Sequence, residues 1–307
     1  MTPDTGLVAI TGATGFVGQA VLDAAAGQGI ALRALARQPQ PSRPGVEWVE
    51  GDLDDTAALA RLVERAEAVI HIAGVVNAPD AEGFAAGNVA GTLNLVTAAM
   101  VAGTPRFVQV SSLSAREPQL SVYGASKRKG EQVVMASSLD WTVVRPPAVY
   151  GPRDREMLEL FRFAKAGIVP LPPHGRMAAI HVEDLARLLL ALVPGGEDVS
   201  HKVFEPDDGH PGGWTHKSFA KAIGWAVGKR ITPLPLPAFA LRAAARGDRL
   251  LRKAAARLTE DRVGYMCHPD WTVRDEARPP AARWQPQIGT RDGLKATAKW
   301  YRDAGWL

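Results

Sequence analysis

The chain has 307 residues, of which 46% are hydrophobic and 22% are charged. This composition is typical of a globular protein with a sizeable core and excludes a mainly disordered chain. The single cysteine, Cys267, excludes an internal disulfide, and no cysteine and histidine spacing matches a zinc site, so we expect no metal. Residues 1–6 contain Asp4 and no basic residue, unlike a secretory signal, which predicts a cytoplasmic protein.

Short apolar runs alternate with longer helical patterns through about the first 150 residues, a pattern typical of a parallel sheet covered on both faces. We expect an α/β fold, a Rossmann-like doubly wound sheet with a smaller, mostly C-terminal substrate-binding subdomain. The predicted strands are 7–11, 31–36, 68–72, 106–111 and 141–145, and the predicted helices are 16–28, 56–65, 85–102 and 121–138. Residues 83–105 carry no charge, but polar residues and glycines interrupt the run, which favours a buried helix over a membrane span.

Proline becomes frequent from Pro146 onward, which marks the point where the chain leaves the regular sheet. We predict a dinucleotide-binding domain at residues 1–152, completed by about 176–200. Residues 153–175 and 201–307 are predicted to form the substrate-binding subdomain. The end of the chain, from residue 283, is amphipathic and rich in aromatic residues, so we expect it to dock on the protein.

A glycine-rich turn follows the first predicted strand and opens a helix, in the sequence TGATGFVG. Because glycine places no side chain in the way, backbone N–H groups and the helix N-terminus can approach a pyrophosphate. A tight turn without a ligand is the alternative, but the position within a strand–helix–strand unit favours a nucleotide. The residues assigned to cofactor binding here are Gly12, Thr14, Gly15, Phe16, Val17 and Gly18.

The end of the second predicted strand bears on the choice of cofactor. Residues 24–46 contain no acidic residue, so the carboxylate that would bind the ribose 2′-hydroxyl of NAD is missing. Arg33 and Arg37 occur there instead, and Arg37, at the expected strand end, is suited to pair with a 2′-phosphate. This predicts NADP(H) rather than NAD(H), with an ordinary exposed arginine as the alternative.

A second set of residues carries the chemistry expected of a hydride-transfer site. Tyr123 and Lys127 lie one helical turn apart, and a neighbouring ammonium favours ionisation of a phenol whose ordinary pKa is near 10. Ser112, at the end of a predicted strand, is expected to hydrogen-bond the substrate oxygen, and Asn88 to anchor a water relay to Lys127. Each residue alone has a structural explanation, but their order after a nucleotide turn favours catalysis.

Taken together, these motifs resemble the extended or atypical short-chain dehydrogenases/reductases of the NAD-dependent epimerase/dehydratase group. The resemblance covers nearly all of the chain and includes HIAG at 71–74, RPPAVYGPR at 145–153 and IHVEDL at 180–185. Many members have alanine where this chain has Gly74. The resemblance implies further cofactor contacts, with Asp52 and Leu53 at the adenine, Ala73 and Gly74 along the cofactor, and Pro146 and Val149 beside the nicotinamide.

Members of this group differ in reaction. The segment 145–154 resembles hydroxysteroid dehydrogenases and flavonoid-type reductases more than sugar epimerases, and selection of NADP(H) argues against an epimerase, which returns its hydride within one turnover. We therefore predict an NADPH-dependent reductase acting on the ketone of a bulky hydrophobic substrate. The specific candidate is a 3-oxo-ceramide or other β-keto lipid, as in bacterial ceramide reductases of this group, or a steroid-like ketone. The alternatives are a nucleotide-sugar 4-epimerase or dehydratase with tightly bound NAD, and a non-catalytic cofactor-binding assembly subunit.

Three features favour a lipid substrate: few polar residues in 161–172, an apolar run at 231–241, and a basic segment at 238–258. In the basic segment, Gly247 weakens the expected helix, and a solvated helix face is the alternative to contact with an anionic membrane surface. We expect a hydrophobic small molecule or lipid as partner, possible peripheral attachment at the inner face of the membrane, no nucleic acid, and a monomer or homodimer. One helical stripe there holds Arg242, Arg246, Arg249, Lys253 and Arg257, with Leu241, Leu251, Ala255 and Leu258 roughly opposite.

Overall fold

A seven-stranded sheet, in the order β11-β6-β5-β4-β1-β2-β3, forms the centre of the N-terminal two thirds of the chain. The computed structural model describes residues 6–252, 256 and 258–307. Every neighbouring pair in this sheet is parallel, which confirms the predicted Rossmann-like fold. The strands are β1 (Val8–Thr11), β2 (Leu32–Ala36), β3 (Val46–Glu50), β4 (Ala68–His71), β5 (Arg106–Val110), β6 (Asp140–Val144) and β11 (Lys202–Phe204).

The five predicted strands lie within one or two residues of observed strands, whereas β3 and β11 were not predicted. Both lie at edges of the sheet. In β3 (VEWVE) the glutamates are exposed and Val49 alone is buried, so the segment lacks the continuous apolar run of a central strand. The strand β11 lies just past the predicted boundary at residue 200 and pairs with β6.

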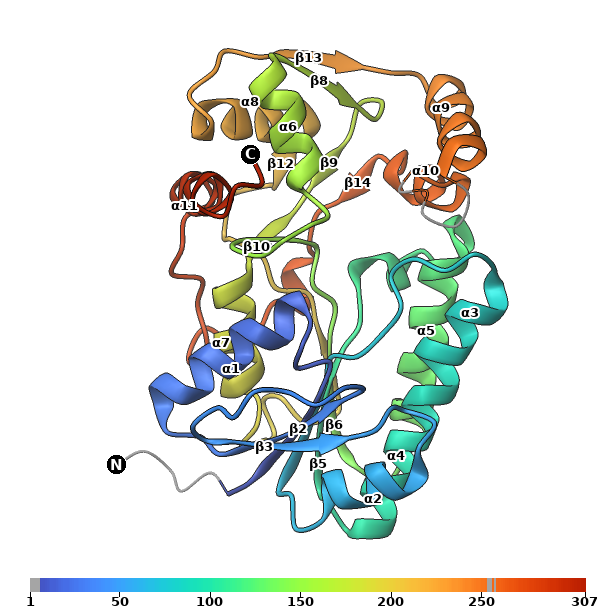
Figure 1. Cartoon of the computed structure of the whole chain (residues 1–307), viewed down its shortest axis with the longest axis vertical. Helices are drawn as coiled ribbons and strands as arrows, with labels where there is room; N and C mark the ends of the chain where they lie inside the picture. Colours follow the sequence, from blue (N-terminus) through green and yellow to red (C-terminus); the bar gives the residue numbers. More distant parts are fainter. Residues whose placement is uncertain (1–5, 253–255, 257) are drawn as a thin grey trace.

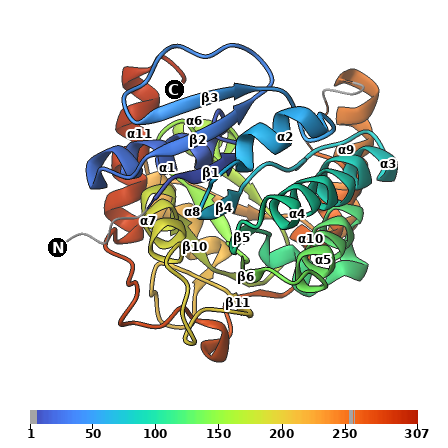
Figure 2. The same ribbon diagram turned by 90° about the horizontal axis from the view of Figure 1, so that it is seen from below.

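Helices cover both faces of the sheet (Figure 2). One face is covered by α1 (Phe16–Gln28) and α7 (Val182–Ala191), which pack on Val8 and Ile10. The other face is covered by α2 (Thr56–Val63), α4 (Gly91–Ala102) and α5 (Val122–Met135), and Ala9 points to that side. Successive residues of β1 thus face opposite helical layers, as expected for a strand buried on both sides.

The predicted helix 85–102 begins earlier and is interrupted. It consists of α3 (Ala81–Ala85), a π-helical turn η1 (Ala86–Ala90) and α4. By length and composition alone, the continuous run Ala81–Ala102 could cross a membrane. Its Leu95, Val96 and Ala99 pack instead in the core between the sheet and α2.

Figure 1 shows a second, smaller layer of structure stacked above the sheet. Its core contains Phe161 and Tyr301, whose rings meet edge to face at 5.1 Å between centroids. The docking predicted for the C-terminal tail is confirmed, because Tyr301 is buried and its hydroxyl donates to the Asp154 carbonyl at 2.7 Å. The elements are β7 (Ala148–Tyr150), α6 (Leu158–Ala166), β8 (Ile168–Leu171), β9 (Arg176–Met177), β10 (Ala179–His181), β12 (Trp214–Thr215), α8 (His216–Ala226), β13 (Thr232–Pro235), β14 (Asp270–Trp271) and α11 (Thr290–Asp303).

The predicted basic helix is present as α9 (Ala238–Arg252), and it continues through Gly247. It packs through Leu241 and Ala245 against Val263 of α10 (Glu260–Met266). The prediction that Leu251 shares the apolar face of Leu241 was wrong, since Leu251 is 86% exposed. Leu258 lies beyond the end of α9, and Lys253, Ala255 and Arg257 lie outside the described residues.

Two apolar stretches that suggested a lipid site have other places in the fold. Phe161 and Leu171 belong to the core of the upper layer. Leu234 and Phe239 are exposed at 46% and 75%. These residues therefore do not by themselves argue for an apolar substrate pocket.

Candidate active site

The glycine-rich turn after β1 has the geometry that a pyrophosphate requires. Gly12 has a φ of +74°, and a Cβ there would lie 2.6 Å from the backbone nitrogen of Ala73. A Cβ on Gly18 would lie 2.6 Å from the Cα of Ala13 and closer still to the Gly12 carbonyl oxygen. Because α1 begins at Phe16 directly after Gly15, which has no side chain to cap the helix, the first N–H groups of α1 are open to an anion.

This turn lies at the point where the strand order reverses. The strands β1 and β4 are neighbours, and their following segments meet at Gly12 and Ala73. The backbone N–H of Ala73 donates to Thr11 Oγ1 at 3.3 Å, and that hydroxyl is 2.7 Å from Nδ1 of the buried His71. Ligands of open α/β sheets bind at such a switch point, and Ala73 and Gly74 lie beside it, so their contact with the cofactor stays a prediction.

A cavity of about 340 Å³ lies beyond the ends of β2 and β3, and Arg37 and Asp52 line it together with Glu50, Gly51 and Asp55. Asp52 Oδ1 accepts the N–H groups of Asp54 and Asp55, and this fixes the start of the turn before α2. Arg33 is used elsewhere, since it donates to the carbonyl oxygens of Arg61 and Glu64. Arg37 thus stands exposed at the place expected for an adenosine ribose.

Leu53 follows on the inner side of this turn. It packs against α4, where a Cβ on Gly91 would lie 2.7 Å from Leu53 Cδ1. Asn94 Nδ2 donates to the Leu53 carbonyl at 2.9 Å and holds the turn in place. The glycine cradle and the cavity together fit a dinucleotide.

The helix α5 carries the predicted catalytic pair. Ser121 caps its N-terminus by accepting the Gly124 N–H at 2.9 Å, which sets the start of the helix and places Tyr123 in its first turn. Lys127 is buried, and its Nζ donates to the Val110 carbonyl at the end of β5 at 2.9 Å. The same Nζ lies 3.5 Å from the position that a Cβ on Gly74 would occupy, so the ammonium sits at the nucleotide crevice.

Ser112 and Tyr123 lie close enough for the serine hydroxyl to influence ionisation of the phenol. The Ser112 Oγ accepts hydrogen bonds from the backbone N–H and the hydroxyl of Ser114, at 3.2 and 2.9 Å. Burial raises the pKa of Tyr123 above its usual value, and the neighbouring Ser112 hydroxyl and Arg262 guanidinium oppose this shift. Burial also lowers the pKa of Lys127 to about 8, opposed by the carboxylate of Glu131. The effect of Lys127 on Tyr123 stays a prediction.

Asn88 lies in the π-helical turn η1 and connects two parts of the site. Its Oδ1 accepts the Val75 N–H at 2.7 Å, and its Nδ2 donates to the Val75 carbonyl and to Ser126 Oγ, both at 2.9 Å. The side chain thereby ties the segment after β4 to α5, and the water relay stays a prediction. A Cβ on Gly74 would lie 2.9 Å from Asn88 Oδ1, which explains glycine where many family members have alanine.

The loop after β6 lies next to the segment that carries Ser112. Pro146 is buried, and its carbonyl accepts the N–H of Leu113, which follows Ser112, at 3.0 Å. Val149 lies in β7, packs against the core beneath α1 and is paired with Ile180 of β10. This loop therefore joins the nucleotide sheet to the segment that carries Ser112.

The sequence did not reveal the contribution of α10. The Asp261 carboxylate accepts the backbone N–H groups of Val122 and Tyr123, at 2.6 and 3.3 Å, and so caps the catalytic helix from outside. The ring of Tyr265 lies 6.2 Å from that of Tyr123, and Arg262 pairs with Glu156. Thr259 before two acidic residues predicts a helix start, but nothing in the sequence predicts a contact across more than a hundred residues.

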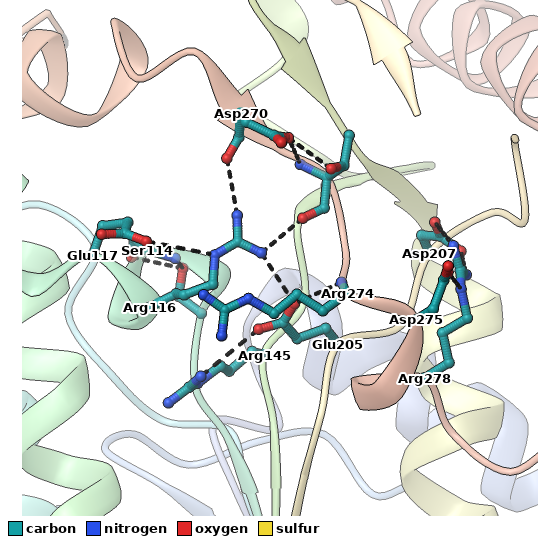
Figure 3. A network of polar contacts seen from close by, with 12 residues as sticks. Ser114, Arg116, Glu117, Arg145, Glu205, Asp207, Asp270, Arg274, Asp275 and Arg278 are labelled. Atoms are coloured by element: carbon teal, nitrogen blue, oxygen red, sulfur yellow. Dashed lines mark hydrogen bonds and ion pairs between the residues drawn. The ribbon is translucent and has the colours of Figure 1, made fainter. Parts of the chain in front are cut away.

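Charged side chains connect the segment after Ser112 to the upper layer, where Arg116 and Arg145 meet Glu205 (Figure 3). Arg145 donates to the carboxylate of Glu131 at 2.7 and 2.8 Å and lies 3.7 Å from Glu205. Arg116, four residues after Ser112, pairs with Glu205 at 3.1 Å and donates to the carbonyl oxygens of Thr272 and Asp270. These contacts fix the segment that follows Ser112 between the seven-stranded sheet and the upper layer.

A glycine cradle at the switch point of a parallel sheet, with a serine, a tyrosine and a lysine beside it, defines an oxidoreductase of the short-chain dehydrogenase/reductase type that uses a nicotinamide dinucleotide. The chain belongs to the NAD dependent epimerase/dehydratase family, whose model matches residues 8–204.

Relatives and solved structures extend this assignment. The chain is 39% identical over 317 aligned residues to a ceramide reductase of Caulobacter vibrioides, covering 100% of this chain and 98% of the relative. It is 26% identical to a 2-alkyl-3-oxoalkanoate reductase of Stenotrophomonas maltophilia, covering 94% and 97%. The Bordetella bronchiseptica enzyme WbmG in complex with NAD and UDP has the same fold, with a TM-score of 0.74, 20% identity and coverage of 98% and 96%.

Proposed function

We propose that the protein is an NADPH-dependent reductase of the ketone in a β-keto lipid, with a 3-oxo-ceramide as the specific substrate. The observation that carries this proposal is the placement of Tyr123 and Lys127 on α5, with Lys127 Nζ hydrogen-bonded to the Val110 carbonyl two residues before Ser112 and lying beside Gly74, in a chain similar over its full length to a ceramide reductase. A second relative is named as a reductase of 2-alkyl-3-oxoalkanoates, which also carry a ketone at the β position of an acyl chain.

The residues divide the reaction between them. Ser112 donates a hydrogen bond to the carbonyl oxygen and holds it beside the Tyr123 hydroxyl. A nicotinamide dinucleotide held at the glycine turn would supply the hydride that the carbonyl carbon accepts. Tyr123 then gives its proton to the oxygen, so that the C=O double bond becomes a CH–OH group. Lys127, as an ammonium, stabilises the resulting phenolate until solvent returns the proton.

The preference for NADP(H) rests on Arg37. It lines the cavity at the end of β2, where an NAD-selective site would carry a carboxylate. Asp55 Oδ1 accepts the Ala58 N–H, and Asp52 Oδ1 accepts backbone N–H groups, so two of the three carboxylates that line the cavity serve the turn before α2, while the third, Glu50, lies at the end of β3. Arg37 is therefore suited to pair with a 2′-phosphate.

The test measures oxidation of NADPH and of NADH by the purified protein with a 3-oxo-ceramide in detergent micelles. We expect turnover with NADPH, and Tyr123→Phe should abolish it while NADPH still raises the melting temperature. Arg37→Ala should weaken NADPH binding at least about tenfold and leave NADH binding nearly unchanged. Undiminished turnover by Tyr123→Phe would exclude the mechanism.

The epimerase alternative is tested with the same protein. It requires NAD that copurifies and a thermal shift with a uridine diphosphate sugar, neither of which the reductase needs. Either result, together with no oxidation of NADPH, would replace the proposal.

A further inference from the structure

The helix α9 presents an apolar face to the outside of the molecule. Phe239, Leu250 and Leu251 are 75%, 81% and 86% exposed. The exposed Ala243 lies between Phe239 and Leu251 around the helix, and the exposed Ala244 lies next to Leu251, seven residues earlier. The opposite side, with Leu241 and Ala245, is buried against α10, so the outward face is a second apolar surface that the fold leaves uncovered.

Arginines border this face along one edge. Arg242, Arg246 and Arg249 follow each other at helical spacings of four and three residues, and all three are exposed. Arg242 lies three residues after Phe239, and Arg246 four residues before Leu250, so the guanidinium stripe adjoins the apolar face directly. Arg246 pairs with Glu260 at 2.6 Å on the surface. An exposed ion pair of this kind is weak, so another anion can replace Glu260.

An exposed apolar face with a basic border suits a helix that lies at the surface of a lipid bilayer. At the boundary of a bilayer, apolar side chains enter the acyl region while arginines reach the lipid phosphates. We propose that α9 docks on an anionic lipid surface and lies in its plane. The cationic edge selects a negatively charged membrane rather than a neutral one, and a second copy of this chain, which would bring the same arginines, fits the border less well.

The position of α9 connects this surface to the active site, a step that rests on the proposed function. The helix packs on α10, and α10 caps the catalytic helix through Asp261 (Figure 1). A membrane-embedded ketone would therefore meet the protein on the side where α10 borders Tyr123. Docking of α9 would hold Tyr123 close to the lipid phase.

The experiment is flotation of the purified full-length protein with vesicles of phosphatidylcholine alone or mixed with phosphatidylglycerol, which requires no activity. We expect binding to the mixed vesicles, weakened by added salt. The double variant Leu250→Ser/Leu251→Ser and the double variant Arg242→Gln/Arg249→Gln should each lose at least about tenfold in vesicle partitioning. Both should keep wild-type turnover with a short-chain, water-soluble β-keto ester.

Matched controls replace exposed residues away from α9. Val101→Ser removes an apolar side chain that is 85% exposed on α4, and Lys229→Gln/Arg230→Gln removes two exposed cations after α8. Both controls should float as the wild type does. The proposal is overturned if the wild type does not bind anionic vesicles or if the α9 variants float as well as the wild type does. It is also overturned if those variants lose only a concentration-dependent self-association. A lack of NADPH turnover with intact vesicle binding would instead count against the proposed function alone.

Discussion

Replacing Glu131 with glutamine tests the buried charges beneath the active site. Glu131 is fully buried and accepts hydrogen bonds from Ser111 Oγ at 2.6 Å and from Arg145 Nε and Nη2 at 2.8 and 2.7 Å. Glutamine keeps the shape but removes the charge opposite a guanidinium that is itself buried. Breaking such a pair costs about 3–5 kcal/mol, and Glu205, 3.7 Å from Arg145, offsets part of this, so we expect a loss of about 3 kcal/mol.

The loss is measured as the free energy of unfolding in urea, with Arg128→Ala as the control. Arg128 contacts the same carboxylate at 3.1 Å, but its side chain is 40% exposed, so its removal should cost less than about 1 kcal/mol. A Glu131→Gln variant within about 1 kcal/mol of wild type would refute the claim that this pair is buried and essential.

The same variant has a second readout. Glu131 holds the pKa of Lys127 up against burial, so its neutralisation should lower that pKa further below about 8. Lys127 is an ammonium ion at pH values below its pKa. In the proposed reaction this ammonium stabilises the phenolate of Tyr123 that remains after proton transfer. The rate of reduction, as kcat/KM, should therefore fall as pH rises through about 8 in the wild type, and at lower pH in Glu131→Gln. Identical pH profiles would refute the coupling of Glu131 to Lys127.

Three further perturbations follow from the described contacts. Gly18→Ala places a Cβ against the backbone of Ala13, so the thermal shift produced by NADPH should be lost while circular dichroism is unchanged; a retained shift would contradict the cradle. Burial raises the pKa of Asp154 to about 7, so the folded state binds the proton more tightly than the unfolded state does. The free energy of unfolding should therefore decline between pH 4 and 7, by an amount on the order of 3 kcal/mol. Urea titrations of the Asp154→Asn variant should lack this decline. Asp261→Asn weakens the cap that α10 places on α5, and it should lower kcat about tenfold with little change in NADPH binding. The control is Asp303→Asn, at the far end of α11; an equal loss of kcat in this variant would show a general effect of charge.

Those parts of the fold and site that depend on nearby residues could be predicted from the sequence. The strand, turn and helix from Val8 to Gln28 follow from an apolar run and three glycines, and Tyr123 and Lys127 share a face because a helix places them one turn apart. The core sheet followed from its buried strands. The edge strand β3 was missed because one exposed face removes the apolar signal.

Contacts between distant segments could not be predicted in this way. The capping of α5 by Asp261 depends on how the upper layer stacks on the sheet, and no local pattern encodes that distance. The exposure of Leu251 has a similar cause, because the wheel of α9 shows two apolar sides and only the position of α10 decides which is buried. Arg37 was predicted to select NADP(H) because residues 24–46 contain no carboxylate, and the binding measurement on Arg37→Ala tests this selection.

The position of Glu205 limits how this protein can be divided. The stretch recognised by the family model ends at residue 204, one residue before the carboxylate that pairs with Arg116. A fragment cut at that border would also lose the Thr272 and Asp270 carbonyl groups, so Arg116 and the segment that carries Ser112 would lose the contacts that hold them in place. We therefore expect that the nucleotide half does not fold by itself and that the whole chain melts in one cooperative transition.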